Sequence, residues 1–309
     1  MAVNAGASAT LPSGEQFVIT HAGREATITE VGATLRSYRV DGDDVLDGFG
    51  EDERATDGRG QVLAPWPNRI AEGRYRYGGH RCQAPLNEVR GRTAIHGLVR
   101  WLDWSLVARA EASVSLGCAI RPQPGYEWRV ELEVTYDLDE HGLTVRLQAV
   151  NTGHERAPFG AGFHPYLTLG RAPIDGLELI VPATHYLDLS DPDRLPPALP
   201  VDSERDFTAP RRIGKTRLDT AYSELIRGDD RHAVARVSDP ESGRSAELWV
   251  SPAYPYLMVY TADAVGHPDR RRAGIAVEPM TCPPNALRSG SGLIELAPGA
   301  SWSGSWGVR

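Results

Sequence analysis

The chain has 309 residues, 41% of them hydrophobic, and a formal net charge of −8 at pH 7. A sizeable core is therefore available, whereas the acidic balance disfavours nucleic acid, which binds basic faces, and anionic membrane surfaces. Residues 1–16 lack a basic start and an apolar run, and no apolar stretch reaches the roughly 18 residues of a membrane span. These features predict a soluble protein of the cytoplasm.

Cysteine and histidine usage argues against a metal centre. Cys82, Cys118 and Cys282 cannot all pair with one another and form no C-x-x-C motif, which fits a reducing compartment. The nine histidines are scattered, with no H-x-H or H-x-x-x-H pair. Structural zinc needs clustered ligands, so we expect no metal.

Short runs of alternating apolar and polar residues, bounded by Gly, Pro, Asn and Asp, recur along the chain. The best pair is 129–137 and 143–151, joined by a hairpin-like turn. Other strands are expected at 16–20, 25–31, 35–40, 105–110, 113–120, 177–181, 233–237, 246–250, 257–261, 274–277, 293–296 and 302–308. No segment beyond about 12 residues keeps a helical rhythm, so one large all-β domain over residues 1–309, a sandwich or barrel, is predicted.

Residues 190–217 are the least strand-like part of the chain. Five prolines lie between Pro192 and Pro210, and the apolar residues among them are isolated. We expect this segment to wrap the surface of the domain and not to link two domains.

The stretch 61–101 contains two segments that can hold polar donors in place. Two prolines flank Trp66 and stiffen the backbone just before Asn68 and Arg69. His96 is followed by a glycine, where the backbone can approach a ligand closely. Taken alone, Arg69 reads equally as half of a structural ion pair, and His96 as a satisfied core histidine.

Three more ionisable residues lie near the ends of expected strands. His164 stands among small and aromatic residues, Asp219 has hydroxyl residues beside it, and Glu278 ends an apolar strand before a proline-rich loop. A carboxylate in the position of Glu278 is costly to bury without a task or a partner, which one of the arginines 270–272 could provide. For Asp219 the simpler interpretation is a turn or capping residue.

Five motifs in this order resemble the aldose 1-epimerase (galactose mutarotase) family: Asn68-Arg69-Ile70, His96-Gly97, His164-x-Tyr166, Asp219, and Glu278-Pro279 with Pro284-Asn285-Ala286 downstream. The resemblance runs from about Gln16 to Trp306 and looks like a bacterial branch of the family. It implies a large antiparallel β-sandwich of the galactose mutarotase-like supersandwich type. It also implies interconversion of the α and β anomers of a hexose without a cofactor, by a monomer or a homodimer.

Carried over by position, Glu278 would be the general base and His164 the general acid. The residues implied to bind the sugar are Arg69, His96, Asp219 and Asn68, with Tyr166, Trp66 or Trp101 as aromatic faces for the ring. Ring opening removes a proton from the C1 hydroxyl and delivers one to the ring oxygen. A glutamate and a histidine have suitable ordinary pKa values for these two transfers.

The substrate stays open at this stage. Met258 occupies the place where galactose mutarotases tend to carry a sugar-binding glutamine, so a glucose-like or anionic hexose is an alternative. Four basic residues, Arg211, Arg212, Lys215 and Arg217, would suit a 6-phospho or 6-sulfo group, but a solvated loop is the usual fate of such a run. The rival functions are a glycoside hydrolase using Glu278 and Asp219, and a non-catalytic sugar-binding domain.

Overall fold

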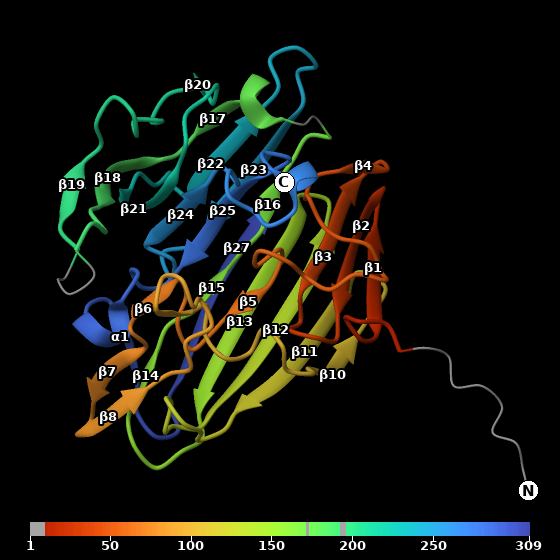
Figure 1. Ribbon diagram of the computed structural model, residues 1–309. Helices are drawn as coiled ribbons and strands as arrows, with labels where there is room; N and C mark the ends of the chain where they lie inside the picture. The colour runs from red at the N-terminus through yellow and green to blue at the C-terminus, as the bar shows by residue number, and fades with distance from the viewer. Residues whose placement is uncertain (1–9, 171–172, 192–195) are drawn as a thin grey trace, which may run out of the picture.

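The computed structural model of the chain describes residues 10–170, 173–191 and 196–309. Its largest sheet has nine antiparallel strands in the order β10-β11-β12-β13-β27-β23-β22-β17-β20. In Figure 1 this sheet runs diagonally through the molecule and contains the C-terminal strand. The strands are β10 Ser105–Arg109, β11 Ser113–Ile120, β12 Val130–Asp139, β13 Gly142–Asn151, β27 Ser301–Val308, β23 Ser245–Val250, β22 Ala233–Ser238, β17 Glu178–Ile180 and β20 Arg211–Arg212.

A second sheet has eight strands in the order β19-β18-β21-β24-β25-β15-β5, with β16 paired to β25. Two of its members, β15 and β16, lie close together in sequence and both pair with β25, which matters for the site described below. The strands are β19 Ala198–Pro200, β18 Ala183–Leu187, β21 Asp219–Leu225, β24 Tyr256–Tyr260, β25 Ile275–Met280, β15 Gly162–Phe163, β5 Val62–Leu63 and β16 Tyr166–Leu167.

Smaller sheets complete the fold. A four-stranded sheet lies against the β10–β12 side of the large sheet, as Figure 1 shows in red, and is tied to it by the Tyr136 hydroxyl, which donates to the Ala33 carbonyl at 2.6 Å. Three two-stranded sheets and the short α-helix α1 lie around the remaining edges, and two short 3-10 helices, Ile174–Gly176 and Pro268–Arg270, lie between strands. These elements are β1 Gln16–His21, β2 Arg24–Thr29, β3 Leu35–Val40, β4 Asp43–Asp44, β6 Arg69–Ala71 with β9 Thr93–Ile95, β7 Arg74–Tyr77 with β8 His80–Gln83, β14 Ala157–Phe159 with β26 Ile294–Leu296, and α1 Ala286–Ser289.

The core follows from the alternation of residues along the strands. In β12 the residues from Val130 to Leu138 are buried at every second position, with glutamates in the outward places near its start. Val134 lies directly opposite Leu147 of β13, so the two strands present one apolar face. Each large apolar side chain buried in this way contributes about 1.5–3 kcal/mol. The main core cluster runs from Phe17 to Val308 and takes in residues of both large sheets.

The predicted all-β sandwich class is confirmed, and most expected strands lie within a few residues of their predicted bounds. Sequence reasoning missed β18 and β21, which are neighbours in the second sheet. Residues 190–217, of which 192–195 lie outside the described part, contain β19 and β20, each at the edge of a sheet. In the part of the chain that the structure describes, no helix is long and apolar enough to cross a membrane. The assignment of residues 1–309 to one domain stays a prediction.

Candidate active site

Strand pairing brings Glu278 and His164 together although they lie far apart in the chain. Gly162 of β15 pairs with Met280, and Tyr166 of β16 pairs with Ala276, in the antiparallel register of β25. The same register sets His164, midway between the two pairs, across from Glu278. The His164 Nε2 atom lies 3.3 Å from Glu278 Oε1, and the two residues are only 5% and 2% exposed.

Burial opposes charge on both members of this pair. It raises the pKa of the Glu278 carboxyl well above its ordinary value, and the nearby charge of Asp219 raises it further, whereas Arg69 lowers it. Burial lowers the pKa of His164 to about 3, with a further contribution from Arg100. In the sugar-free site the uncharged forms of both groups are therefore favoured.

Two polar atoms of the pair have no hydrogen-bond partner among the described residues. They are Glu278 Oε2 and His164 Nδ1, both shielded from solvent. An unsatisfied buried polar group costs about 1–3 kcal/mol, so natural proteins leave few of them. These two atoms are therefore available to bind a polar ligand.

His96 is held as a neutral hydrogen-bond donor. Its Nδ1 accepts the backbone N–H of Asn68 at 3.2 Å, and its own backbone N–H donates to the Asn68 carbonyl at 2.8 Å. Burial lowers the pKa of His96 well below its ordinary value, and the proximity of His164 lowers it further. Because Nδ1 accepts, the single proton of the neutral ring lies on Nε2, which is free to donate.

The hydrogen bond from the Asn68 N–H to His96 Nδ1 also bears on whether His96, His164 and Glu278 could bind a metal ion. One ligand atom each from His96, His164 and Glu278 lies within 4.8 Å of the others. A metal needs a free lone pair on each ligand, but Nδ1 of His96 is engaged and its Nε2 carries the proton. The trio is therefore better suited to hydrogen bonding and proton transfer, and the absence of a metal stays a prediction.

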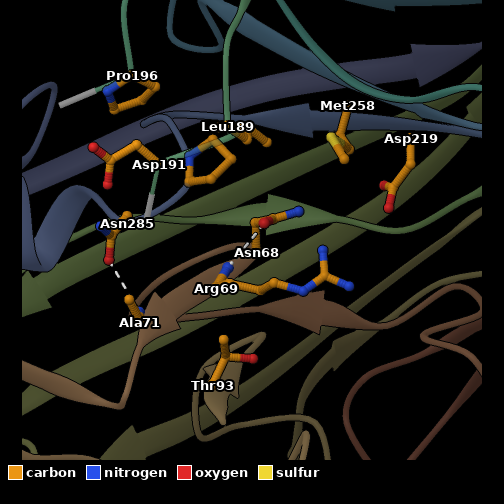
Figure 2. Close-up of a pocket in the computed structure, with 11 residues that line it drawn as sticks. Asn68, Arg69, Ala71, Thr93, Leu189, Asp191, Pro196, Asp219, Met258 and Asn285 are labelled. Atoms are coloured by element: carbon orange, nitrogen blue, oxygen red, sulfur yellow. Dashed lines mark hydrogen bonds between the residues drawn. The ribbon is translucent and has the colours of Figure 1, made fainter. Parts of the chain in front are cut away.

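A cavity of about 250 Å³ lies next to the pair. It is below the roughly 300–1,000 Å³ of pockets for drug-sized ligands, so it suits a small molecule. Figure 2 shows Arg69 and Asp219 reaching toward the same space from opposite walls. The lining residues are Asn68, Arg69, Ala71, Thr93, Leu189, Asp191, Pro196, Asp219, Met258, Pro284 and Asn285.

The His164–Glu278 pair lies just behind this wall and not in it. Met258 of the wall is the strand partner of Glu278, and Ala221 is the partner of Met258. Asp219, two residues before Ala221, therefore shares that face of the sheet. Asp219 stays in contact with solvent, yet partial burial of its carboxyl raises its pKa, while the charge of Arg69 lowers it. Glu278 is thus the strand neighbour of a residue that lines the cavity.

The loop at Asn285 holds the strand that carries Arg69. Asn285 donates its backbone N–H to the Arg69 carbonyl at 2.7 Å, and its side-chain oxygen accepts the Ala71 N–H at 3.0 Å, the bond drawn in Figure 2.

The glycine at position 97 is explained by packing within the chain. A Cβ on Gly97 would lie 2.0 Å from the Ala64 carbonyl oxygen. Glycine is therefore needed so that the backbone near Ala64 can pack against residue 97, and not so that a ligand can approach.

The aromatic candidates lie outside the cavity wall. Tyr166 is 1% exposed and stacks on His164 with ring centroids 5.0 Å apart, which places it behind the histidine. Trp66 is buried and donates its ring N–H to the Ala94 carbonyl, whereas Trp101 is exposed beside Arg100. The prediction that Tyr166 contacts the sugar is not tested by these positions.

Arg69 is also half of an ion pair, as the simpler interpretation expected. Its Nε and Nη2 atoms each donate to Glu88 at 2.8 Å, and the Thr93 hydroxyl donates to the same carboxylate. Two parallel bonds of this kind fix the plane of a guanidinium. The remaining N–H groups of Arg69 can bind a sugar oxygen, so the ion pair and the binding role are compatible.

We expect Glu88→Gln to raise KM for the sugar about tenfold, which corresponds to the roughly 1.4 kcal/mol of a weakened charge-assisted bond, while kcat stays within about threefold. The reason is that Arg69 loses its fixed orientation but keeps its charge. Initial-rate kinetics on the variant check this. Glu72→Gln, which removes an exposed partner of Arg74, is the matched control and should leave KM unchanged. An unchanged KM in Glu88→Gln would contradict the orienting role.

Two further expectations can be compared with the structure. The arginines 270–272 have partners other than Glu278: Arg270 binds Asp47 and Glu53, Arg271 donates to the Val265 carbonyl, and Arg272 binds Asp175 and Asp263. In the basic stretch 211–217, none of the residues is among those that line the described cavity, and three have partners elsewhere: Arg211 with the Ser203 and Glu204 carbonyls, Lys215 with Asp175, and Arg217 with Asp263.

The chain belongs to the aldose 1-epimerase family, because the model of that family matches residues 15–309. Among curated proteins, an uncharacterized Escherichia coli (strain K12) protein, YihR, is 35% identical over 293 residues, which cover 93% of this chain and 90% of the relative. Galactose mutarotase of Mus musculus is 26% identical over 281 residues, covering 82% of this chain and 80% of the mouse protein.

Solved structures show the same fold. The structure of the galactose mutarotase/aldose epimerase homologue from C. elegans matches with a TM-score of 0.82 at 20% identity, covering 96% of this chain and 99% of that one. The structure of galactose 1-epimerase from Lactobacillus acidophilus matches with a TM-score of 0.78 at 22% identity, covering 95% and 94%. At these identities the likeness supports the galactose mutarotase-like fold and nothing finer.

Proposed function

We propose that the protein is an aldose 1-epimerase that interconverts the α and β anomers of a hexose. The observation that carries the proposal is the buried contact of 3.3 Å between His164 Nε2 and Glu278 Oε1, which lies next to a small cavity lined by Arg69 and Asp219. Glu278 Oε2 and His164 Nδ1 have no hydrogen-bond partner among the described residues, and Arg69 and Asp219 line the cavity. Membership of the family supports an isomerase of this class.

The reaction needs one proton shared by two groups. Ring opening transfers the C1 hydroxyl proton to the Glu278 carboxylate, while the protonated His164 gives its proton to the ring oxygen and the C1–O5 bond breaks. Rotation about C1–C2 then turns the aldehyde. Closure runs the two transfers backwards on the other face, which regenerates the carboxylate and the imidazolium. A positioned acid and base typically contribute about 10²–10⁴-fold.

The pKa directions of the two groups favour the protonation state that follows ring opening. The uncharged pair, favoured in the empty site, is the form that holds the open-chain aldehyde, and the charged pair is the form that opens the ring. Moving one proton across the 3.3 Å contact converts the first into the second. Arg69 lowers the pKa of Glu278 and so favours its carboxylate. The acid and base roles therefore alternate between opening and closure.

The side chains around the His164–Glu278 pair would bind and orient the sugar. The Nε2–H of His96 and the free N–H groups of Arg69 can donate to sugar oxygens and stabilise charge as it shifts. Asn68 and Asp219 lie in the cavity wall, where the carboxylate can accept sugar hydroxyl groups. Met258, Leu189 and the wall prolines offer apolar surface to the carbon face of the ring.

A polarimeter tests the proposal directly. Freshly dissolved α-glucose or α-galactose should reach its equilibrium rotation faster with the protein than in buffer alone. Comparison with the 6-phospho and 6-sulfo hexoses decides the substrate class. A chromogenic glycoside should not be cleaved, since cleavage would indicate a hydrolase. Binding of sugar without any acceleration would instead identify a non-catalytic sugar-binding domain.

The pH dependence has a definite sign. Because burial lowers the pKa of His164 to about 3, the uncharged pair takes up a second, inhibitory proton only far below the ordinary histidine range. We therefore expect kcat/KM, corrected for the spontaneous reaction, to show no fall centred near pH 6.5 between pH 8 and pH 5. A clear loss with a midpoint near 6.5 would contradict this protonation scheme.

A further inference from the structure

Arg59 is a buried cation outside the cavity wall. It is 1% exposed, with Nη2 3.0 Å from Asp47 Oδ2 and Nη1 3.3 Å from Asp57 Oδ2. Burying a guanidinium is expensive even when it is paired, and replacing such a pair by apolar residues is often neutral or stabilising. Fold stability alone is therefore a weak reason for a cation at this point.

The aromatic ring of Tyr166 links this cation to His164. The Arg59 guanidinium carbon lies over the ring, 4.6 Å from its centroid, and the same ring stacks on the imidazole at 5.0 Å with an interplanar angle of 16°. Hydrogen bonds hold both the side chain and the backbone of Tyr166. Its hydroxyl donates to the Asp57 carbonyl at 2.9 Å, and its backbone carbonyl accepts the Asp47 N–H at 2.9 Å.

The backbone around Arg59 also packs directly on His164. The Gly60 N–H donates to the His164 carbonyl at 2.9 Å, and the His164 N–H donates to the Gln61 carbonyl at 3.2 Å. A Cβ on Gly58 would lie 2.5 Å from Cδ2 of the imidazole. Segment 57–61 is thus the backing surface of the histidine, and Arg59 ties that surface to Tyr166.

We propose that Arg59, acting through the ring of Tyr166, is a positioning residue for His164. This inference rests on the proposed function, in which the imidazole must keep its Nε2 on Glu278 while it gains and loses a proton. A stacked ring and a bound backbone restrict rotation of the imidazole, and the cation–π contact, worth about 2 kcal/mol when desolvated, holds the ring. The charge of Arg59 also opposes a second proton on the site.

Several charged or titratable groups act on His164 from the elements packed around it. Burial is the main cause of the lowered pKa of His164, and Arg59 is one of several charges that add to it. The groups around His164 are Arg100 and His96 beside the β9 end, Arg69 on β6, Glu278 on β25, Tyr166 on β16 and Arg59 itself. Arg59 lowers the pKa of His164, so removing its charge moves that pKa upward.

Kinetics of Arg59→Met test the proposal. We expect kcat to fall about tenfold with KM within about twofold, because the catalytic group loses orientation whereas the cavity wall is untouched. Arg59→Lys keeps the cation and should recover most of kcat. Arg205→Met is the matched control, since Arg205 also lies 4.6 Å over a tyrosine ring, that of Tyr186, and should leave kcat unchanged.

A second readout does not depend on turnover. In protein labelled with ¹⁵N-histidine, the ring signals of His164, assigned by their loss in His164→Asn, should move in Arg59→Met, with an upward shift of the imidazole pKa. If wild-type protein shows no mutarotation, the proposed function fails. Unchanged His164 ring signals in Arg59→Met would instead show that Arg59 does not act on the imidazole.

Tyr166 variants keep the proposal testable if Arg59→Met does not fold. Tyr166→Phe retains the ring and should lose less kcat than Tyr166→Leu, which removes the stack. Unchanged kcat and unchanged His164 signals in Arg59→Met, or equal losses in the two Tyr166 variants, would overturn the inference.

Discussion

Replacing Glu278 by glutamine should lower the protein-catalysed rate of mutarotation by about 10²–10⁴-fold, the typical contribution of a positioned base. The amide has nearly the shape of the carboxyl group but cannot take the C1 hydroxyl proton. Because burial already favours the uncharged acid at this position, the neutral amide should be tolerated, and the melting temperature should change little. Polarimetry and thermal unfolding on the same preparation measure the two effects.

Glu133→Gln is the matched control for that experiment. Glu133 lies on the exposed face of β12, so the same chemical change there should alter neither rate nor stability. If Glu278→Gln keeps the wild-type rate while remaining folded, Glu278 is not the base, and the proton-transfer scheme fails.

Replacing His164 by asparagine should lower kcat by about 10²-fold or more, since no group then delivers a proton to the ring oxygen. Asparagine preserves some hydrogen bonding but has no basic nitrogen and cannot stack on Tyr166 as the imidazole does. The loss should appear mainly in kcat because the cavity wall is intact.

A variant of His96 distinguishes sugar binding from proton transfer. His96→Asn should raise KM more than His164→Asn does, because the proposed scheme has the neutral His96 donate to the sugar through Nε2. A His164→Asn variant with normal kcat, or one whose only defect is in KM, would mean that His164 binds the sugar and transfers no proton.

Long alternating strands could be predicted from the sequence, but the short strands around the site could not. β12 and β13 carry a clear period of two and were placed within two residues of their observed bounds. β15 and β16 have only two residues each, too few for any period to show. β21 mixes polar and apolar residues on both faces, so Asp219 at its start resembled a turn residue.

The site could be predicted only where residues lie within recognisable motifs. Asn68, Arg69, His96, Asp219 and the His164–Glu278 pair lie in such motifs, and the structure brings them together. Glu88 could not be found, because it lies in a loop with several other charges and only the folded chain sets it on Arg69. The contact between Arg59 and Tyr166 likewise depends on tertiary packing alone.

Magnetisation-exchange NMR on the two anomeric protons of an equilibrated hexose tests the central claim most directly. At equilibrium no net reaction occurs, so exchange between the α and β signals reports only interconversion of the anomers. We predict exchange that rises in proportion to the concentration of wild-type protein and is absent with Glu278→Gln. Equal exchange with the two proteins, or none with wild type for any hexose, would contradict the account.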